Sequence, residues 1–327
     1  KETSRVSDPS DYVFTTVGSH SVSEASALAA AGPEAELIMP KQKNKGITCA
    51  VALSPHIINP GKVGRGCGRL AVIGIGPGSN DWRAPEATNE ISRATEVVGY
   101  KLYLDLLGPL IKGKNRYDYS LGEERDRVAE ALRLAAEGKE VALISSGDPG
   151  IYAMACLVFE LIEHGPLGNV KPEWQRIDVH VVPGISALQA AAAKIGAPLG
   201  HDFCTISLSD LLTPWEVIEG RLKAAAVGDF VIALYNPVSI KRRKQIGFAR
   251  DILLEYRPAA TPVVLAKNLG REEEKIDVIA LSELDFKKVD MLTVVLIGSS
   301  QTQLMKLNSG KEYVYTPRGY GDKKEKF

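Results

Sequence analysis

The architecture of this chain is most readily predicted from the segment Ser145–Ser146–Gly147–Asp148–Pro149–Gly150–Ile151–Tyr152. It follows the apolar residues 141–144, which are typical of a buried strand, and precedes the apolar residues 154–164, which are typical of a helix. Asp148 is expected to cap the helix and Pro149 to be its first residue, because both residue types are favoured there. A loop in this place lies at the carboxyl edge of a sheet, where it can hold a small ligand or can simply start a helix.

Strand and helix patterns alternate along the chain from Leu70 onward. Amphipathic spacing predicts one helical face from Ala87 to Val98, and Ser120 with Glu123 predicts a capping box at the start of the next helix. This alternation is typical of an α/β fold with mostly parallel strands, and residues 181–184 are a candidate hinge between two subdomains. Strands are predicted at residues 70–75, 141–144, 177–182, 203–208, 230–235, 263–266 and 292–297.

The N-terminal part differs from the rest of the chain. It holds one helix pattern, opened by a capping box of Ser21 and Glu24, and strand patterns at 37–39 and 47–53, which are too few to bury a core alone. A stretch rich in Gly and Pro follows it. We therefore expect a partial small α/β domain at 1–54, a linker at 55–69, an N-terminal subdomain at 70–182, a C-terminal subdomain at 183–303 and a tail at 304–327.

Charge and cysteine content narrow the class of protein. The chain has 40 Lys and Arg against 40 Asp and Glu, which argues against nucleic-acid binding as its main task. Its apolar runs are shorter than the ~18–20 residues of a membrane span, and its polar start does not resemble a signal peptide. We therefore expect no membrane partner. The four cysteines are scattered and have no neighbouring His, so we also expect free thiols in the cytoplasm and no metal site. They are Cys49, Cys67, Cys156 and Cys204.

Glycine and proline mark four loops, each directly after an expected strand, at residues 74–79, 147–149, 183–187 and 233–237. The first departs from the dinucleotide pattern Gly-x-Gly-x-x-Gly, because Ser79 replaces the third glycine and Pro77 has no N–H. None of the loops has the spacing of a catalytic triad or a Walker lysine. We expect a small-ligand crevice that positions reactants instead of supplying a nucleophile.

In this order, Gly-x-Gly-Pro-Gly, Gly-Asp-Pro, Pro-Gly-Ile-Ser-Ala and Tyr-Asn-Pro resemble the tetrapyrrole methylase family, over residues 70–300. Segments 147–155 and 207–215 most resemble the branch that methylates precorrin-3B at ring carbon 17 and contracts the macrocycle in cobalamin biosynthesis. The resemblance implies two α/β subdomains with S-adenosylmethionine in a cleft between them, S-adenosylhomocysteine as product, a precorrin-type tetrapyrrole as substrate, and a homodimer. It implies cofactor contacts at Pro77, Ser146, Gly147, Asp148, Ile151, Ser186, Ala187, Asn236 and Leu269.

Ring contraction adds a requirement for proton chemistry. A ring hydroxyl must lose its proton, so a general base or a polarising donor is expected nearby. Asp148 is interpreted as a positioning residue, and the candidates for proton chemistry are Ser209, Asp210, Lys101 and Tyr103. Because the substrate is a polycarboxylate, cations are expected at the rim of the cleft. The candidates for substrate binding are Ser207, Arg242 and Arg243, the two arginines within the basic run 241–244.

The N-terminal part has a resemblance of its own. Residues 17–18, 21–25, 40–41 and 48–52 resemble the end of the small domain in the cobalt-precorrin-5A hydrolase family. The expectation is a module that works with other cobalamin-pathway enzymes, without hydrolysis. Four alternatives for the whole chain stay open. Two are close to the main interpretation: the cobalt-containing version of the same methylation, and methylation at another ring position, which the run 207–210 disfavours. The others are a nicotinamide oxidoreductase, which Pro77 and Ser79 disfavour, and a non-catalytic tetrapyrrole carrier.

Overall fold

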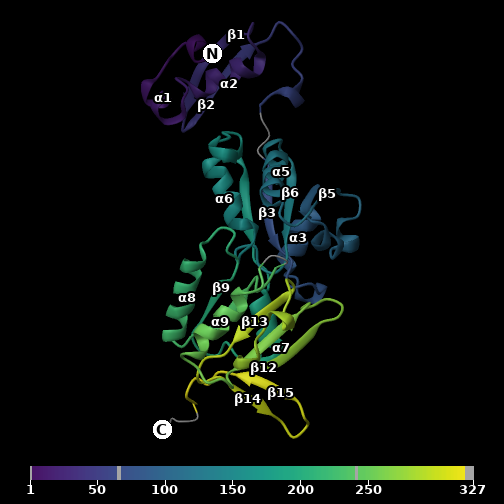
Figure 1. The fold of residues 1–327 in the computed structure, drawn as a ribbon. Helices are drawn as coiled ribbons and strands as arrows, with labels where there is room; N and C mark the ends of the chain where they lie inside the picture. The colour runs from purple at the N-terminus through teal and green to yellow at the C-terminus, as the bar shows by residue number, and fades with distance from the viewer. Residues whose placement is uncertain (1, 65–67, 240–241, 321–327) are drawn as a thin grey trace, which may run out of the picture. The chain divides into compact units, whose positions relative to one another are not determined.

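The computed structural model describes residues 2–64, 68–239 and 242–320, and it divides into two units, Lys1–Gly66 and Cys67–Phe327 (Figure 1). In the first unit, helix α2 packs against an antiparallel pair of strands, with Leu28 and Ala31 buried against Leu37 and Ala52. This small core agrees with the few apolar residues that the segment offers. The elements of the unit are η1 Glu2–Arg5, α1 Asp11–Val17, α2 Val22–Ala31, β1 Glu36–Asn44, β2 Ile47–Leu53 and η2 Pro60–Lys62.

The capping box predicted at the start of α2 is wrong. Ser21 is the N-cap by position, but its hydroxyl finds no partner among the described residues. The Glu24 carboxylate instead accepts N–H bonds from Lys41 at 2.7 Å and from Ser7 at 2.8 Å. Burial alone would raise the pKa of Glu24, but these bonds outweigh it, and the pKa lies below its usual range. Glu24 therefore ties strand β1 and the residues before α1 to helix α2.

The second unit begins with a five-stranded parallel sheet in the order β5-β4-β6-β3-β7. Helices α5 and α6 bury apolar side chains on one face of it, and α3 and α4 do so on the other (Figure 1). The predicted helical face from Ala87 to Val98 is too long, because α3 ends at Arg93 and Val98 lies in β4. The elements are β3 Arg69–Gly74, α3 Pro85–Arg93, β4 Glu96–Tyr100, α4 Lys101–Asp105, β5 Asn115–Tyr119, α5 Glu124–Ala136, β6 Glu140–Ser145, α6 Met154–His164 and β7 Asp178–Val182.

A second five-stranded sheet follows, in the order β12-β11-β13-β10-β9. Here β9 and β10 are parallel, whereas the other neighbouring strands are antiparallel, so the expectation of mostly parallel strands fails for this sheet. The connection from β11 to β12 is too short for a crossover helix, and such a connection forces an antiparallel pair. Helices α8 and α9 cover one face, and α7 the other. The elements are α7 Ala187–Ile195, β9 Phe203–Ser207, α8 Trp215–Val227, β10 Val231–Tyr235, α9 Gln245–Leu254, β11 Pro262–Lys267, β12 Lys275–Ala280 and β13 Thr293–Ile297.

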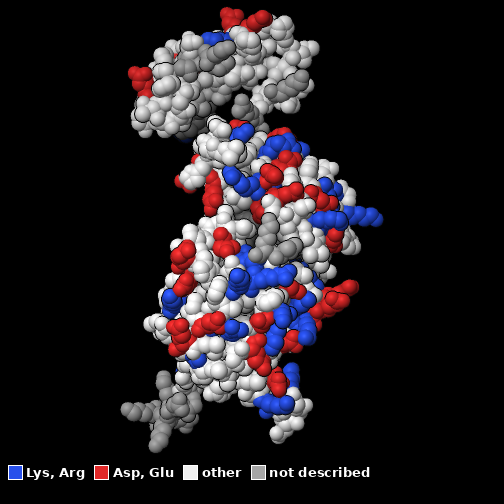
Figure 2. Space-filling view, viewed as in Figure 1, with Lys and Arg blue, Asp and Glu red and all other residues white. Residues whose placement is uncertain are grey.

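The C-terminal residues are more ordered than a tail. From residue 304 onward we expected a tail, but β14 Gln303–Lys306 and β15 Glu312–Tyr315 form a hairpin, and β15 pairs in parallel with β8 Gly196–Ala197. None of the helices in the described part of the chain is long and apolar enough to cross a membrane. Acidic and basic side chains are interspersed over the face shown in Figure 2. Short 3-10 turns are η3 Asn80–Trp82, η4 Gly108–Ile111, η5 Pro166–Gly168, η6 Trp174–Arg176, η7 Leu281–Glu283 and η8 Phe286–Lys288.

Candidate functional site

Three of the four predicted loops meet through their backbones, at the carboxyl ends of β3, β6 and β7. Gly147 donates its N–H to the carbonyl of Gly76 at 2.7 Å, and Gly76 donates to the carbonyl of Gly147 at 3.2 Å. A Cβ at Gly184 would lie 2.1 Å from the Gly147 carbonyl oxygen, and a Cβ at Gly74 would lie 2.5 Å from the same atom. Real Cβ atoms do not approach that closely, so glycine is required where these loops cross.

Asp148 does not have the local role that its sequence context predicts. Helix α6 begins at Met154 with Ala153 as its N-cap, so Asp148 is not a helix cap. Its carboxylate accepts the N–H of Gly150 at 2.8 Å and the N–H of Gly184 at 3.1 Å. The side chain therefore closes its own turn and fixes the neighbouring loop, because an ionised carboxylate can accept several bonds at once.

The loops at Ser186 and Tyr235 join the same junction. Ser186 caps helix α7 in a capping box with Gln189 and is buried. The Tyr235 hydroxyl accepts the N–H of Leu188 at 3.2 Å, so the end of β10 is held to the first turn of α7. The next residue, Asn236, has a positive φ of 49° and turns the chain sharply at this point.

The remaining predicted cofactor residues lie at the same junction with different exposures. Ile151 is half-buried, and its N–H donates to the Asp148 carbonyl at 3.4 Å. Ala187 and Leu269 belong to the apolar cluster between α7 and the second sheet, where Leu269 is buried. The side chain of Leu269 is thus part of the core, which leaves its backbone for a ligand.

Arg271 reaches this junction, although the sequence analysis did not single it out. Its Nε donates to the Pro77 carbonyl at 3.0 Å, and its second terminal nitrogen, Nη2, donates to the Ser146 hydroxyl at 3.0 Å. The guanidinium carbon lies 5.8 Å from the centre of the Tyr103 ring. A Cβ at Gly78 would lie 2.5 Å from Cγ of Arg271, so the two loops pack tightly. The one available signal was the charge of Arg271 next to the predicted segment 267–269.

A second group of polar side chains follows β9 and β10. Asn236 donates its amide N–H to the Ser207 hydroxyl at 3.1 Å, and Ser209 accepts a bond from Arg242 at 3.3 Å. Gln245 donates to the Asp210 carboxylate at 2.8 Å. Ser207, Ser209, Asp210 and Asn236 are therefore brought together.

The basic run 241–244 does not form a uniform exposed rim. Arg242 is only 7% exposed and donates to the Asn236 carbonyl at 2.7 Å, so it holds the loop after β10. Burial lowers the pKa of Arg242, and Asp210 opposes this effect. Arg243 is exposed, and residue 241 lies outside the described residues. The prediction of a rim cation is thus wrong for Arg242, because its side chain is used inside the fold.

Lys101 and Tyr103 lie in α4, directly after β4. Lys101 forms an ion pair with Asp105 at 3.0 Å, four residues further along the chain. Burial raises the pKa of Tyr103, while the positive charges of Arg271 and Arg127 oppose the rise. Tyr103 is consequently protonated near neutral pH and can act as a hydrogen-bond donor.

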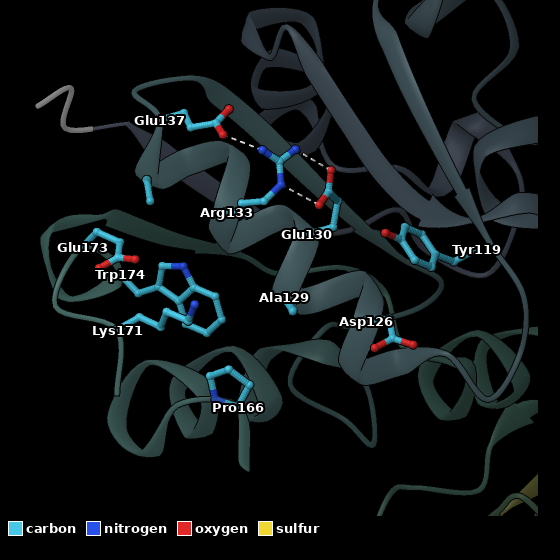
Figure 3. A pocket seen from close by; sticks show the side chains of 11 residues that line it. Tyr119, Asp126, Ala129, Glu130, Arg133, Glu137, Pro166, Lys171, Glu173 and Trp174 are labelled. Atoms are coloured by element: carbon cyan, nitrogen blue, oxygen red, sulfur yellow. Dashed lines mark hydrogen bonds and ion pairs between the residues drawn. The ribbon is translucent and has the colours of Figure 1, made fainter. Parts of the chain in front are cut away.

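Two surface cavities accompany these elements. One, of about 550 Å³, is lined by residues after β4 and β5, among them Tyr100, Lys101 and Ser120. The other, of about 450 Å³, lies between α5 and residues 166–174, with Arg133 bonded to Glu130 and Glu137 on one wall (Figure 3). The cavity in Figure 3 contains none of the predicted site residues. In the described residues, no cluster of three or more His, Cys, Asp or Glu could hold a metal ion.

Comparisons with known proteins agree with this arrangement. Residues 1–52 match the family model "Cobalamin synthesis G C-terminus". The chain is 46% identical to "Precorrin-3B C(17)-methyltransferase" of Sinorhizobium sp, over 77% of this chain and 97% of that protein. It is 43% identical to "Probable cobalt-factor III C(17)-methyltransferase" of Salmonella typhimurium, over 77% of this chain and 99% of that protein.

A solved structure gives the same result for the fold. "Crystal structure of the methyltransferase CobJ" superposes with a TM-score of 0.70 at 40% identity, covering 76% of this chain and all of that one. The model "Tetrapyrrole (Corrin/Porphyrin) Methylases" matches residues 69–285, which include every predicted loop. This chain therefore belongs to the tetrapyrrole (corrin/porphyrin) methylase family.

Proposed function

We propose that the second unit transfers a methyl group from S-adenosylmethionine to ring carbon 17 of precorrin-3B and contracts the ring to precorrin-4 during cobalamin biosynthesis. The observation that carries this proposal is the 46% identity to a relative of that name over nearly all of the relative's length. The convergence of the loops at Pro77, Gly147, Ser186 and Asn236 supports it, because these positions come from four different strand ends.

The residues at the junction fit such a cofactor. Ser145, the last residue of β6, is 3% exposed, and its hydroxyl has no partner among the described residues. We propose that Pro77, Ser146, Gly147, Asp148, Ile151, Ser186, Ala187, Asn236 and Leu269 hold the cofactor. S-adenosylmethionine, when bound, supplies a methyl group that is already activated by a positively charged sulfonium.

The protein then contributes orientation more than covalent chemistry. Holding two reactants in the reactive geometry can lower a barrier by about 7–11 kcal/mol, which needs no nucleophilic side chain. The glycine contacts among the three loops and the two bonds of Asp148 provide a rigid support for this. We propose Asp148 as a positioning residue, because both of its oxygens are already occupied by backbone N–H groups.

Ring contraction also requires a proton to be moved. We propose Tyr103 as a hydrogen-bond donor to the migrating part of the ring, since burial keeps its phenol protonated. Ser209 and Asp210, in the polar group after β9 and β10, are the other candidates for proton chemistry. Asp210 is the carboxylate among these candidates. Replacing Asp210 with Asn should lower contraction more than methylation if it accepts the proton. Equal losses of both steps would remove it as the base.

A second candidate function is the same methylation on a cobalt-containing substrate. The 43% identity to the Salmonella relative named for cobalt-factor III favours it specifically. The test is to incubate the protein with methyl-labelled S-adenosylmethionine and either metal-free precorrin-3B or cobalt-factor III. Mass spectrometry and NMR then locate the label and report contraction. A ring without label in both incubations would refute the proposed activity, and label on one substrate alone would choose between the two.

The oligomeric state, the cellular location and the role of the first unit are also proposals. We propose a homodimer in the cytoplasm, with the first unit acting as a partner module for other enzymes of the pathway. The support is the match of residues 1–52 to a cobalamin-synthesis family and the presence of free thiols at Cys49, Cys156 and Cys204. Light scattering after size-exclusion chromatography tests the dimer, and a monomer at micromolar concentration would contradict it.

A further inference from the structure

Arg271 is a charged residue of the junction to which methyl transfer itself assigns no role. It follows β11 in the second sheet, yet its side chain crosses to loops of the first sheet. Nε and Nη2 donate to Pro77 and Ser146, each at 3.0 Å. These two bonds use one edge of the planar guanidinium.

The second edge of Arg271 is formed by Nη1 and the remaining N–H of Nη2. A guanidinium carries five N–H donors in a fixed fork, and two parallel N–H groups at this edge can bind a carboxylate in a bidentate manner. The ion pairs found among the described residues do not include Arg271. Three donors of a positively charged group are thus left for a ligand.

The surroundings of that edge favour an anion. The guanidinium lies over Tyr103, whose ring is 5.1 Å from Tyr100 at a right angle. Arg127 is 3% exposed, its Nε has no partner among the described residues, and its nearest carboxylate, Glu124, is 3.9 Å away. Arg271 and Arg127 both act electrostatically on Tyr103, and Glu124, whose effect is smaller, opposes them. Partly buried cations with so little compensation are stabilised by a bound anion.

A surface cavity borders two residues that contact Tyr103 and Arg127, although Arg271 is not part of its lining. The cavity of about 550 Å³ is lined by Tyr100 and Ser120, and the Ser120 carbonyl accepts a bond from Arg127 at 3.1 Å. The visible surface, in contrast, mixes acidic and basic side chains (Figure 2).

The geometry points to Arg271 as a specificity-determining residue whose outer edge binds one carboxylate side chain of the tetrapyrrole, over the face of Tyr103. This rests on the proposed function, which supplies a polycarboxylate substrate. Because the inner edge of the same guanidinium holds Pro77 and Ser146, occupancy by substrate and the position of the cofactor loops become linked. The carboxylate of the cofactor is the other possible anion, and binding measurements separate the two sources.

The experiment measures two dissociation constants on the full chain, for uroporphyrin III by fluorescence and for S-adenosylhomocysteine by calorimetry. The variant R271M should weaken uroporphyrin III binding roughly 10- to 100-fold, the usual effect of losing hydrogen bonds to a charged group. It should also weaken S-adenosylhomocysteine binding, because the bonds to Pro77 and Ser146 are lost, but by a smaller factor than it weakens uroporphyrin III binding. The dissociation constant for coproporphyrin III, in which methyl groups replace the acetate side chains, shows whether Arg271 binds an acetate side chain.

Further variants keep the test decisive. S146A removes the inner acceptor, so it should affect S-adenosylhomocysteine more than uroporphyrin III. R125Q, on the exposed side of α5, is the matched control and should leave both constants unchanged. If R271M does not fold, R271K retains the charge without the fork and should still weaken uroporphyrin III binding.

The outcomes separate this inference from the proposed function. Uroporphyrin III binding that is unaffected by R271M and R271K, or a loss confined to S-adenosylhomocysteine, would overturn the assignment. So would a wild-type protein that does not bind uroporphyrin III. Wild-type binding that depends on Arg271 without any methyl transfer would instead refute the proposed function and leave this inference standing.

Discussion

Replacing Asp148 with Asn tests whether this carboxylate positions loops or handles protons. The carboxylate accepts two backbone N–H groups, from Gly150 at 2.8 Å and from Gly184 at 3.1 Å. An Asn side chain has the same shape but only one acceptor oxygen, so its NH2 group must face one of these N–H donors. D148N therefore loses one charge-assisted bond and creates an unfavourable contact between two donors.

The size of the effect follows from that loss. Hydrogen bonds to charged groups contribute about 1.5–3 kcal/mol, and partial exposure of Asp148 reduces this to about 1–2 kcal/mol. For a unit of this size, 1 kcal/mol lowers Tm by about 2–4 °C, so D148N should lower it by roughly 2–8 °C. The gain in Tm on adding S-adenosylhomocysteine should also shrink, because the loops that hold it lose their support.

Differential scanning calorimetry, with and without S-adenosylhomocysteine, measures both effects, and D148A provides the comparison in which both bonds are lost. D148A should be destabilised more than D148N. The reasoning is refuted if D148N keeps the wild-type Tm and ligand response while methyl transfer is abolished. That result would assign Asp148 to the chemical step.

The remaining predictions concern a close contact and a buried carboxylate. G184A should destabilise the second unit by about 1–3 kcal/mol, because its Cβ would lie 2.1 Å from the Gly147 carbonyl oxygen. The control G220A, in α8 with open space around its Cβ, should be neutral or stabilising by up to about 1 kcal/mol; equal Tm values for the two variants would contradict this. The pKa of Glu24 is lowered in the folded protein, so its ionised carboxylate stabilises the first unit at pH values above the usual Glu pKa. This stabilisation is lost as the pH falls through the lower pKa of the folded state. Calorimetry from about pH 7 to about pH 3 should show that loss in wild type and a smaller one in E24Q, and identical pH profiles would disprove it.

The sequence allowed much of the first sheet and the positions of the loops to be predicted. Apolar runs placed β3 and β6 to within a residue or two, since buried parallel strands are continuously apolar, and β7 was placed equally well although it is a partly exposed edge strand. Glycine and proline marked the loops because their backbone requirements are local. The ordered set of motifs carried the family, which the comparisons confirm.

Other features could not be predicted because they depend on pairing between distant segments. Strand β12 was missed, as its residues are only half-buried at the edge of the second sheet. The hairpin of β14 and β15 has four-residue strands, and it is held by the pairing of β15 with β8 and by the burial of Val314. Local charge patterns likewise gave no indication that Arg242 is buried.

The sequence by itself determined the family, the order of the strands and the loops at which a ligand can bind, because these follow from local residue patterns. Only the tertiary structure decided what the polar side chains do. Asp148 looked like a helix cap and proved to join two loops. Arg271 was not singled out from the sequence and proved to reach across to Pro77 and Ser146. The reason is physical: the partners of these side chains lie far away in the chain, and folding alone brings them within hydrogen-bond distance.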